Sequence, residues 1–487
     1  MSIAARLSDP SLFREQGFVG GEWCGAATGA TLAVVDPATG EAIGTVPAMG
    51  RAETQAAIQT AERAFAGWRA LPNVERGRLV ATWHDLMLAN IEDLATIMTI
   101  EQGKPLAEAR GEVRYAAGFL KWFAEESCRV YGDTIPAPTG DRRIIVLKEP
   151  VGVAAAITPW NFPAAMITRK AGPALAAGCP IIIKPSELTP YSALALAVLA
   201  ERAGLPKGVV SVLTGMPQEI GGELTSNIGV RKLSFTGSTR VGQLLMQQCA
   251  STMKRVSFEL GGNAPFLIFD DADVDLAVAG LMASKFRNSG QTCVCANRVL
   301  VQDGIYDRFA DKLSAAVSRL VVGNGLEDGV TIGPLINKAA VEKVDRHIDD
   351  ARAKGAVVLA SARAAQGELF AAPTVLGGAN VDMALASEET FGPVAPLFRF
   401  RDESEAVEIA NATPYGLASY FFTSDLNRAW RVTEKLEFGM VGLNTGSVSI
   451  EAAPFGGVKQ SGIGREGSKY GIEEYLSIKA FHIGGMA

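Results

Sequence analysis

Between residues 153 and 260 the chain alternates between short apolar segments and amphipathic segments of helical length. The predicted strands are Val153–Ile157, Ile181–Lys184, Val209–Leu213, Lys232–Thr236 and Arg255–Leu260. The predicted helices between them are Ala164–Ala177, Ser192–Ala203, Pro217–Thr225 and Thr239–Cys249. Strands and helices that alternate in this way form a doubly wound, mostly parallel sheet. Because such sheets bind ligands beyond the carboxyl ends of their strands, we expect the functional site there.

A chain of 487 residues is too long for a single hydrophobic core, and a second α/β unit is predicted after Gly261-Gly262. Its first elements are a strand at 265–269, a helix near 273–286 and a strand at 298–301, with further alternation to about Gly442. The segments 141–147 and 474–483 are predicted as strands outside both units. A lone terminal strand commonly pairs with another strand, and another subunit is one candidate. The predicted fold class is therefore α/β, with two doubly wound domains and a small β element for oligomerisation.

The composition excludes several classes of function. A net charge of −6 provides no basic surface for nucleic acid and no polybasic membrane patch. The first twenty residues carry Arg6, Asp9, Arg14 and Glu15 and do not form a signal peptide, and no uncharged apolar run is long enough to span a bilayer. Six cysteines scattered without a dense framework indicate reduced thiols, and no metal-binding spacing is present. We expect a cytoplasmic protein without a metal.

Three short segments carry the residue types that acyl-thioester chemistry requires. Cys293 follows Gly290-Gln291-Thr292, where a loop can present a thiol to a cleft. Glu259 lies in an apolar segment before two glycines, and Asn161 lies in the rigid turn Thr158–Pro163. A nucleophile, a base and an oxyanion donor are the three roles involved. Their joint occurrence indicates an enzyme.

Each of these residues also has a simpler interpretation. Most cysteines are inert core filler, but the residues before Cys293 are too polar and flexible for a core. Glu259 could be a surface carboxylate, although burial between Phe258 and Leu260 would raise its pKa toward that of a useful base. Asn161 could simply cap the helix that follows it.

Two glycine-containing segments are candidates for phosphate binding. Gly462–Gly467 matches a dinucleotide fingerprint as a string, but it follows no buried strand, so a glycine-rich turn is the better interpretation. Phe235–Thr239 runs from an apolar strand through a glycine turn into a helix. Backbone N–H groups at that helix start could hold a pyrophosphate.

Over almost its full length, the chain resembles the aldehyde dehydrogenase superfamily. The likeness rests on Thr158–Pro163, Ile183–Glu187, Phe235–Ser238, Phe258–Gly262, Gly290–Cys293, Glu388–Pro393 and Pro454–Gly457. Within the superfamily, Lys285–Arg298 and Arg465–Gly471 look like the succinate-semialdehyde and glutarate-semialdehyde dehydrogenases. The resemblance implies a Rossmann-like NAD(P)-binding domain at 1–130 and 151–260, a catalytic domain at 261–455, and an oligomerisation element at 131–150 and 456–487.

The resemblance also implies an activity, which is oxidation of an aldehyde, foremost succinate semialdehyde, to its acid. Cys293 would attack the carbonyl, the Asn161 amide and the Cys293 backbone N–H would hold the oxyanion, and Glu259 would activate water to hydrolyse the thioester. The residues implied for the cofactor are Trp160, Lys184, Glu187, Gly237, Ser238, Glu389 and Phe391. A homotetramer or homodimer and a role in GABA degradation are implied as well.

Cofactor choice and substrate choice depend on charged residues. Glu187 would accept a hydrogen bond from a ribose 2′-hydroxyl and repel a 2′-phosphate, so NAD is expected over NADP. An ω-carboxy aldehyde requires a fixed cation, and Arg169 and Arg287 match carboxylate-binding arginines of the semialdehyde group. Ser449 matches an assisting serine. Cys295, two residues after the nucleophile, could form a reversible disulfide with it or could be a spectator thiol.

Two other functions are compatible with parts of the sequence. A CoA-acylating dehydrogenase would release the acyl group to CoA, but members of that type lack the hydrolytic glutamate, so Glu259 opposes it. A binding protein that kept the fold and lost the chemistry is opposed by the joint presence of Cys293, Asn161 and Glu259.

Overall fold

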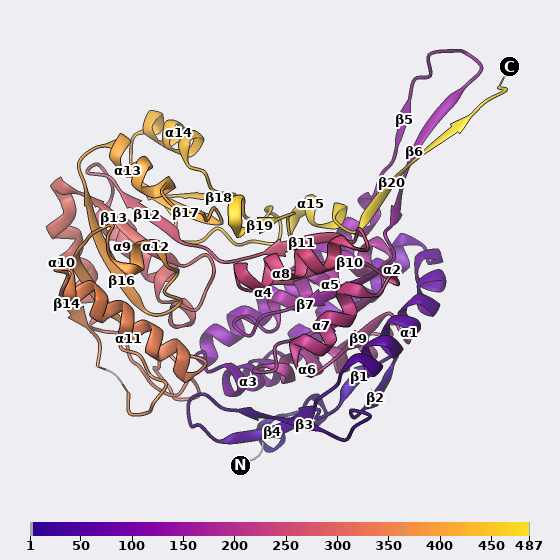
Figure 1. Ribbon diagram of the computed structural model, residues 1–487, viewed down its shortest axis with the longest axis horizontal. Helices are drawn as coiled ribbons and strands as arrows, with labels where there is room; N and C mark the ends of the chain where they lie inside the picture. Colours follow the sequence, from indigo (N-terminus) through magenta and orange to yellow (C-terminus); the bar gives the residue numbers. More distant parts are fainter. Residues whose placement is uncertain (1–2, 364, 487) are drawn as a thin grey trace.

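The alternating region forms the centre of an eight-stranded sheet in a computed structural model, which describes residues 3–363 and 365–486 (Figure 1). Its parallel strands are β7 (Val153–Ile157), β8 (Ile181–Lys184), β9 (Val210–Val212), β10 (Val230–Thr236) and β11 (Arg255–Glu259). The strand order is β19-β11-β10-β7-β8-β9-β1-β2. Antiparallel edge strands are added by β1 (Gly17–Val19), β2 (Glu22–Cys24) and β19 (Gly462–Ile463). The predicted doubly wound sheet is confirmed.

Helices cover both faces of this sheet because successive strand residues point to opposite sides. In β8, Ile181 and Ile183 pack on one face and Ile182 on the other. The first face is covered by α5 (Ala165–Ala177) and α6 (Pro190–Arg202), with α2 (Asn73–Ala89), α3 (Ile91–Gln102) and α4 (Leu106–Glu126) outside them. The second face is covered by α1 (Arg51–Ala70), α7 (Pro217–Ser226) and α8 (Thr239–Ala250).

A second, seven-stranded sheet confirms the second α/β unit. Its order is β14-β15-β16-β13-β12-β17-β18, with only β14 paired antiparallel among these strands. The strands are β12 (Ala264–Ile268), β13 (Ala296–Gln302), β14 (Val357–Ser361), β15 (Thr374–Ala379), β16 (Val394–Phe400), β17 (Ala418–Phe422) and β18 (Met440–Leu443). One face packs on α9 (Val274–Lys285) and α10 (Tyr306–Val317), and the other on α11 (Lys338–Ala353), α13 (Glu403–Asn411) and α14 (Leu426–Lys435).

A narrow three-stranded arm projects from the first lobe, which is the eight-stranded sheet with its helices; the second lobe is the seven-stranded sheet with its helices (Figure 1). It consists of β5 (Asp133–Ile135), β6 (Arg143–Pro150) and the C-terminal strand β20 (Leu476–Ile483). The strand predicted at 141–147 thus begins two residues later and runs on to Pro150. The terminal strand begins after the short helix α15 (Ser468–Glu473), not at Glu474. β20 pairs antiparallel with β6 of its own chain and lies at the edge of the sheet.

We propose that the chain divides into 1–130 with 151–260, 261–455, and an arm formed from 131–150 and the C-terminal segment. One strand crosses these proposed limits. Gly462–Ile463 pairs with β11 and so belongs to the first sheet, although it lies in the range 456–487 assigned to the oligomerisation element. A separate hairpin, β3 (Thr31–Val35) with β4 (Ala42–Pro47), flanks the first lobe, and α12 (Ala384–Ser387) precedes a site loop.

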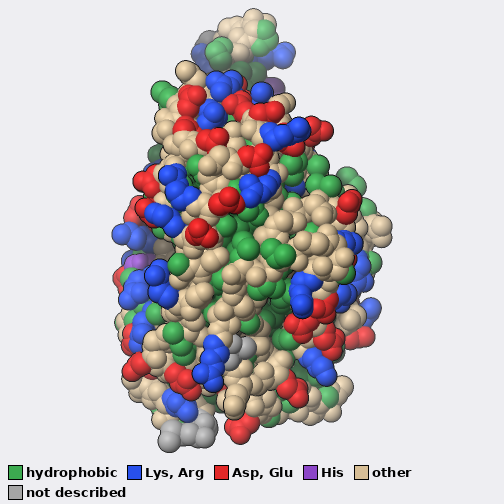
Figure 2. Space-filling view, turned by 90° about the vertical axis from the view of Figure 1, so that its left-hand side faces the viewer, with side chains coloured by type: hydrophobic (Ala, Val, Ile, Leu, Met, Phe, Trp, Pro, Cys, Tyr) green, Lys and Arg blue, Asp and Glu red, His purple; other side chains and the backbone are tan. Residues whose placement is uncertain are grey.

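The surface carries charges of both signs. Lysine and arginine side chains are intermixed with aspartate and glutamate over the face shown in Figure 2. This distribution accords with the small net charge of −6. Within residues 3–363 and 365–486, no helix combines the length and the apolar character needed to cross a bilayer.

Candidate active site

The Cys293 loop joins α9 to β13 and has an uncommon backbone conformation. Asn288, Ser289 and Gly290 are all left-handed, with φ of 50°, 57° and 76°. A non-glycine residue in this region costs roughly 1–3 kcal/mol and persists only where the surroundings impose it. A Cβ added at Gly290 would collide with the carbonyl of Gly392, so only glycine permits the close approach of these two loops. The loop leaves Cys293 partly exposed at its end.

Asn161 follows the carboxyl end of β7 and is fastened to the Cys293 loop. Its Nδ2 donates to the Gln291 carbonyl at 2.9 Å, and the Nδ2 of Asn288 donates to the Asn161 carbonyl at 2.9 Å. These bonds assign the amide orientation and leave one Asn161 N–H for a further acceptor. The N-cap of α5 is Ala164, and Asn161 does not cap that helix. The interpretation of Asn161 as a helix cap is therefore wrong.

A cavity of about 380 Å³ brings most of the predicted residues together. It lies between the two lobes, beyond the carboxyl ends of β7, β10 and β11, where the topology predicts a ligand. Of the residues predicted from the sequence, its walls include Cys293, Asn161, Trp160, Gly237, Ser238, Glu389 and Phe391. Lys184 and Glu187 stand outside this lining, at and just beyond the end of β8.

Glu259 is the last residue of β11 and is buried, with 2% of its surface exposed. The alternative of a surface carboxylate is therefore wrong. Burial raises the pKa of Glu259 well above its usual range, and the nearby negative charge of Glu466 adds to that effect. Among the described residues, its Oε2 has no hydrogen-bond partner. A buried carboxyl with a free oxygen and a raised pKa is suited to exchange a proton with water.

Two further groups at the cavity hold protons more tightly than usual. Burial raises the pKa of the Cys293 thiol to about 12, with the charges of Glu389 and Glu259 opposing ionisation and that of Arg169 favouring it. Burial also raises the pKa of Glu389 to about 7, and its bond from the Gly262 N–H acts the other way. At neutral pH, the thiol of the isolated protein is therefore protonated and must lose its proton before it can attack a carbonyl.

Arg287 and Ser449, both predicted for the substrate, lie together. They line a second cavity of about 20 Å³, with Tyr420 on its wall, which holds about one water molecule. The guanidinium of Arg287 lies over the Phe162 ring, 5.2 Å from its centre. This cavity is next to the Cys293 loop because Val294 lines it as well.

Arg169, the third residue predicted for the substrate, is buried in an ion cluster. Its Nε lies 2.7 Å from the Glu466 carboxylate, and its guanidinium lies 3.8 Å from the centre of the Phe455 ring. Lys170 Nζ donates to Glu466 at 2.5 Å and to Thr236 at 2.6 Å. The charge of Arg169 is thus already balanced within the protein. Glu466 was not predicted from the sequence, since it lies within Gly462–Gly467, which we interpreted as a glycine-rich turn.

The residues predicted for the dinucleotide lie around and beside the cavity. Ser238 is the N-cap of α8, directly after β10, so the helix start faces the cavity. A Cβ at Gly237 would collide with the Phe235 ring, which is why glycine is needed in this turn. Trp160 and Phe391 meet edge to face at 5.6 Å, and Lys184 pairs with Glu187 at 2.9 Å. Apolar walls, a helix N-terminus and a carboxylate beside a lysine fit a dinucleotide.

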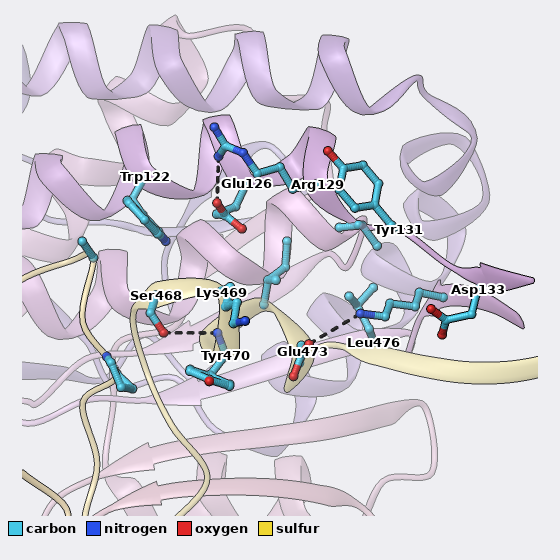
Figure 3. A pocket seen from close by; sticks show the side chains of 15 residues that line it. Trp122, Glu126, Arg129, Tyr131, Asp133, Ser468, Lys469, Tyr470, Glu473 and Leu476 are labelled. Carbon is cyan, nitrogen blue, oxygen red and sulfur yellow. Dashed lines mark hydrogen bonds and ion pairs between the residues drawn. The ribbon is translucent and has the colours of Figure 1, made fainter.

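Another cavity, of about 580 Å³, lies at the base of the arm (Figure 3). Its walls carry two ion pairs, Arg129 with Glu126 at 2.7 Å and Lys148 with Glu473 at 3.5 Å. None of the residues that we predicted for catalysis, cofactor or substrate lines it.

Comparison with known proteins identifies the class. The sequence model of the aldehyde dehydrogenase family matches residues 23–481 of the chain. The chain therefore belongs to the aldehyde dehydrogenase family and is an NAD(P)-dependent aldehyde dehydrogenase. This confirms the superfamily resemblance.

The similarity extends over nearly the whole chain. Glutarate-semialdehyde dehydrogenase of Pseudomonas putida is 61% identical over 474 residues, which cover 97% of this chain and 98% of the relative. The NADP(+) succinate-semialdehyde dehydrogenase GabD of Escherichia coli is 60% identical over 480 residues, covering 98% and 100%. The crystal structure of succinate-semialdehyde dehydrogenase from Burkholderia pseudomallei matches with a TM-score of 0.97 and 62% identity, covering 98% of this chain and 99% of that one.

Proposed function

We propose that this enzyme oxidises succinate semialdehyde to succinate through a thioester on Cys293. The observation that carries the proposal is the convergence of Cys293 and Asn161 on one cavity, beside the buried carboxyl of Glu259. An aldehyde, NAD(P)⁺ and water give a carboxylate, NAD(P)H and two protons. The bound dinucleotide supplies the hydride acceptor.

The protein's own residues perform the other steps. The Cys293 thiol releases its proton, which is one of the two protons of the overall reaction, and the thiolate attacks the aldehyde carbon. The free N–H of Asn161 and the Cys293 backbone N–H hold the resulting alkoxide. Stabilising the alkoxide in a fixed position favours hydride loss, which leaves the thioester. Glu259 then takes a proton from the water that hydrolyses it. A carboxyl beside the thioester also argues against release of the acyl group to CoA.

The substrate assignment rests on the cation beside the nucleophile loop. Arg287 and Ser449 would hold the ω-carboxylate, and Arg169 would contribute its charge from the adjoining ion cluster. Relatives with 60% and 55% identity carry the name succinate-semialdehyde dehydrogenase, which supports the four-carbon substrate. Glutarate semialdehyde is the second candidate, because a relative with 61% identity carries that name. Either substrate is an ω-carboxy aldehyde.

For the cofactor we propose a preference for NAD. Glu187 would accept the ribose 2′-hydroxyl and repel a 2′-phosphate, while its ion pair with Lys184 offsets part of that repulsion. Trp160, Gly237, Ser238, Glu389 and Phe391 would bind the pyrophosphate and the nicotinamide end. The Escherichia coli relative is named for NADP(+), so the preference needs a direct test.

Cys295 is proposed as a redox partner of Cys293. Both thiols are free, and the Cys295 sulfur accepts a bond from the buried Lys285 Nζ at 3.3 Å. Oxidation by a peroxide would join the two sulfurs and remove the nucleophile, and a thiol reductant would restore it.

Self-association is proposed from the arm. β20 lies at the edge of its sheet, and such an edge is suited to pair with a second chain. A homotetramer or homodimer would cover it. We place the enzyme in the cytoplasm, in a reaction that removes the semialdehyde formed in GABA degradation.

Replacing Arg287 by alanine should raise KM for succinate semialdehyde about 10- to 100-fold, since a charge-assisted bond contributes about 1.5–3 kcal/mol. KM for butyraldehyde should change little. Steady-state kinetics with both aldehydes measure this, with Arg399→Ala, a half-exposed arginine on β16, as the control. An equal loss with both aldehydes would refute the carboxylate role.

The cofactor preference is tested by kcat/KM for NAD and NADP. We expect NAD to be favoured, and Glu187→Gln should improve the ratio for NADP about tenfold, as removing about 1.4 kcal/mol of repulsion would. Glu75→Gln, an exposed carboxylate on α2, serves as the control. A tenfold advantage for NADP in the unmodified enzyme would contradict the preference.

Peroxide treatment should inactivate the enzyme reversibly. Peptide mass spectrometry should find a Cys293–Cys295 disulfide, and dithiothreitol should remove it and restore activity. Cys295→Ser should lose the recovery, while Cys128→Ser, which changes an exposed thiol, should keep it. Inactivation with oxidised Cys293 and no disulfide would show that Cys295 is a spectator.

A further inference from the structure

A buried lysine stands directly behind the Asn161 turn. Lys104 lies in the connection between α3 and α4 and is almost completely buried. Its Nζ donates to the Asn161 carbonyl at 2.8 Å and lies 4.1 Å from the centre of the Phe162 ring. Lys104 thus contacts two successive residues of the turn that carries the proposed oxyanion donor.

The partner of this lysine is also buried and also holds the turn. Glu112, on α4, pairs with Lys104 through Oε2. Its Oε1 accepts the backbone N–H groups of Ala164 at 3.0 Å and Ala165 at 3.2 Å. Those N–H groups open α5, so Glu112 supplies the cap that Asn161 does not. One ion pair therefore grips the turn at its carbonyl and just after its end.

The opposite side of the turn is held by the Cys293 loop. Asn288 and Gln291 bond Asn161 from that side, and the Asn288 N–H donates to Glu108 at 2.8 Å. Glu108 and Glu112 are one turn apart on α4. The same helix thus carries a carboxylate to each of the two loops that meet at the nucleophile.

A buried ion pair contributes little net free energy to the stability of a fold. Desolvation of the two charges offsets most of their attraction, and apolar replacements are often as stable. What such a pair does provide is a fixed geometry, because both charges demand specific donors and acceptors. Among the described residues, the polar contacts of Lys104 Nζ and of the Glu112 carboxylate are with each other or with residues 161–165.

We propose that Lys104 and Glu112 are positioning residues that hold the Asn161 amide at the site of the developing oxyanion. The inference rests on the proposed function, in which Asn161 stabilises that charge. Loss of either residue would let the turn relax away from Cys293. Because oxyanion donors act in the transition state, the defect should appear in kcat and leave KM little changed.

The test is a double-mutant cycle with kcat as the readout. Loss of one oxyanion donor lowers kcat about 100- to 1,000-fold, so the kcat of Asn161→Ala should fall by a factor in that range. Lys104→Met keeps the volume and removes the charge, and it should lower kcat about 10- to 100-fold, as a misplacement of about 1 Å does. Lys104→Met combined with Asn161→Ala should be no slower than Asn161→Ala alone.

Matched variants separate positioning from stability. Lys232→Met removes another fully buried lysine, which bonds Ser257 in the first sheet, and it should lower Tm with kcat unchanged. Glu112→Gln, which keeps the shape of the side chain, should reproduce the kcat loss and the non-additivity, and it replaces Lys104→Met if that variant does not fold.

The outcomes distinguish this inference from the proposed function. If Lys104→Met or Glu112→Gln lowered kcat as much in the Asn161→Ala protein as in the unmodified enzyme, the positioning role would be overturned. The proposed mechanism would remain intact. An unchanged kcat in Lys104→Met or in Glu112→Gln would do the same. An undiminished kcat in Asn161→Ala alone would remove the oxyanion role of Asn161, and with it the inference.

Discussion

The hydrogen bond from the Asn161 amide to the Gln291 carbonyl joins the two halves of the active site. Asn161 follows a strand of the first sheet, whereas Gln291 lies in a loop that leads into the second sheet. The return bond from Asn288 to the Asn161 carbonyl closes a reciprocal clamp across the lobe boundary. Because Cys293 comes two residues after Gln291, this clamp sets the position of the sulfur relative to the amide. Asn288 and Ser289 adopt the unfavourable left-handed backbone conformation, and the bonds of this clamp can hold them in it.

Electrostatics form a second layer around this clamp. Four ionisable side chains lie in one buried cluster at the carboxyl end of the first sheet, and these are Arg169, Lys170, Glu259 and Glu466. Glu466 is matched by the two cations, and the pKa of its carboxyl stays below the usual range under their influence. Glu259, whose Oε2 has no hydrogen-bond partner in the described part of the chain, has a pKa raised above the usual range. Burial alone would raise the pKa of both carboxyls. The difference between the two pKa values therefore comes from the positions of the cations.

Residue pattern alone predicted the architecture because each strand and helix has a local signal. The alternation at 153–260 fixed the parallel sheet, and polar residues before Cys293 marked a loop. Some observed strand ends differ from the predicted ones by a few residues, because pairing with a neighbouring strand determines where a strand ends. The strand predicted at 141–147, for example, extends to Pro150, where it pairs with β20. The register of two-residue strand β19 depends on contacts with β11, about two hundred residues away, and no local pattern reports it.

The supporting residues were beyond sequence reasoning for the same reason. Lys104, Glu112 and Glu466 are charged residues in segments whose sequence is typical of an ordinary helix or turn, and they bond partners 8 to 296 residues away. Arg169 was found as a cation, but its pairing with Glu466 required the fold. Features of a single segment could be predicted from the sequence, whereas contacts between distant charged residues could not.

The most direct test of the mechanism is to stop it at the acyl-enzyme. Glu259→Gln protein mixed with succinate semialdehyde and NAD should form about one NADH per subunit and then stall, because water is no longer activated. Mass spectrometry should find one acyl group on Cys293, which hydroxylamine removes. Sustained NADH formation without an adduct, or an acyl group on any other residue, would contradict the account.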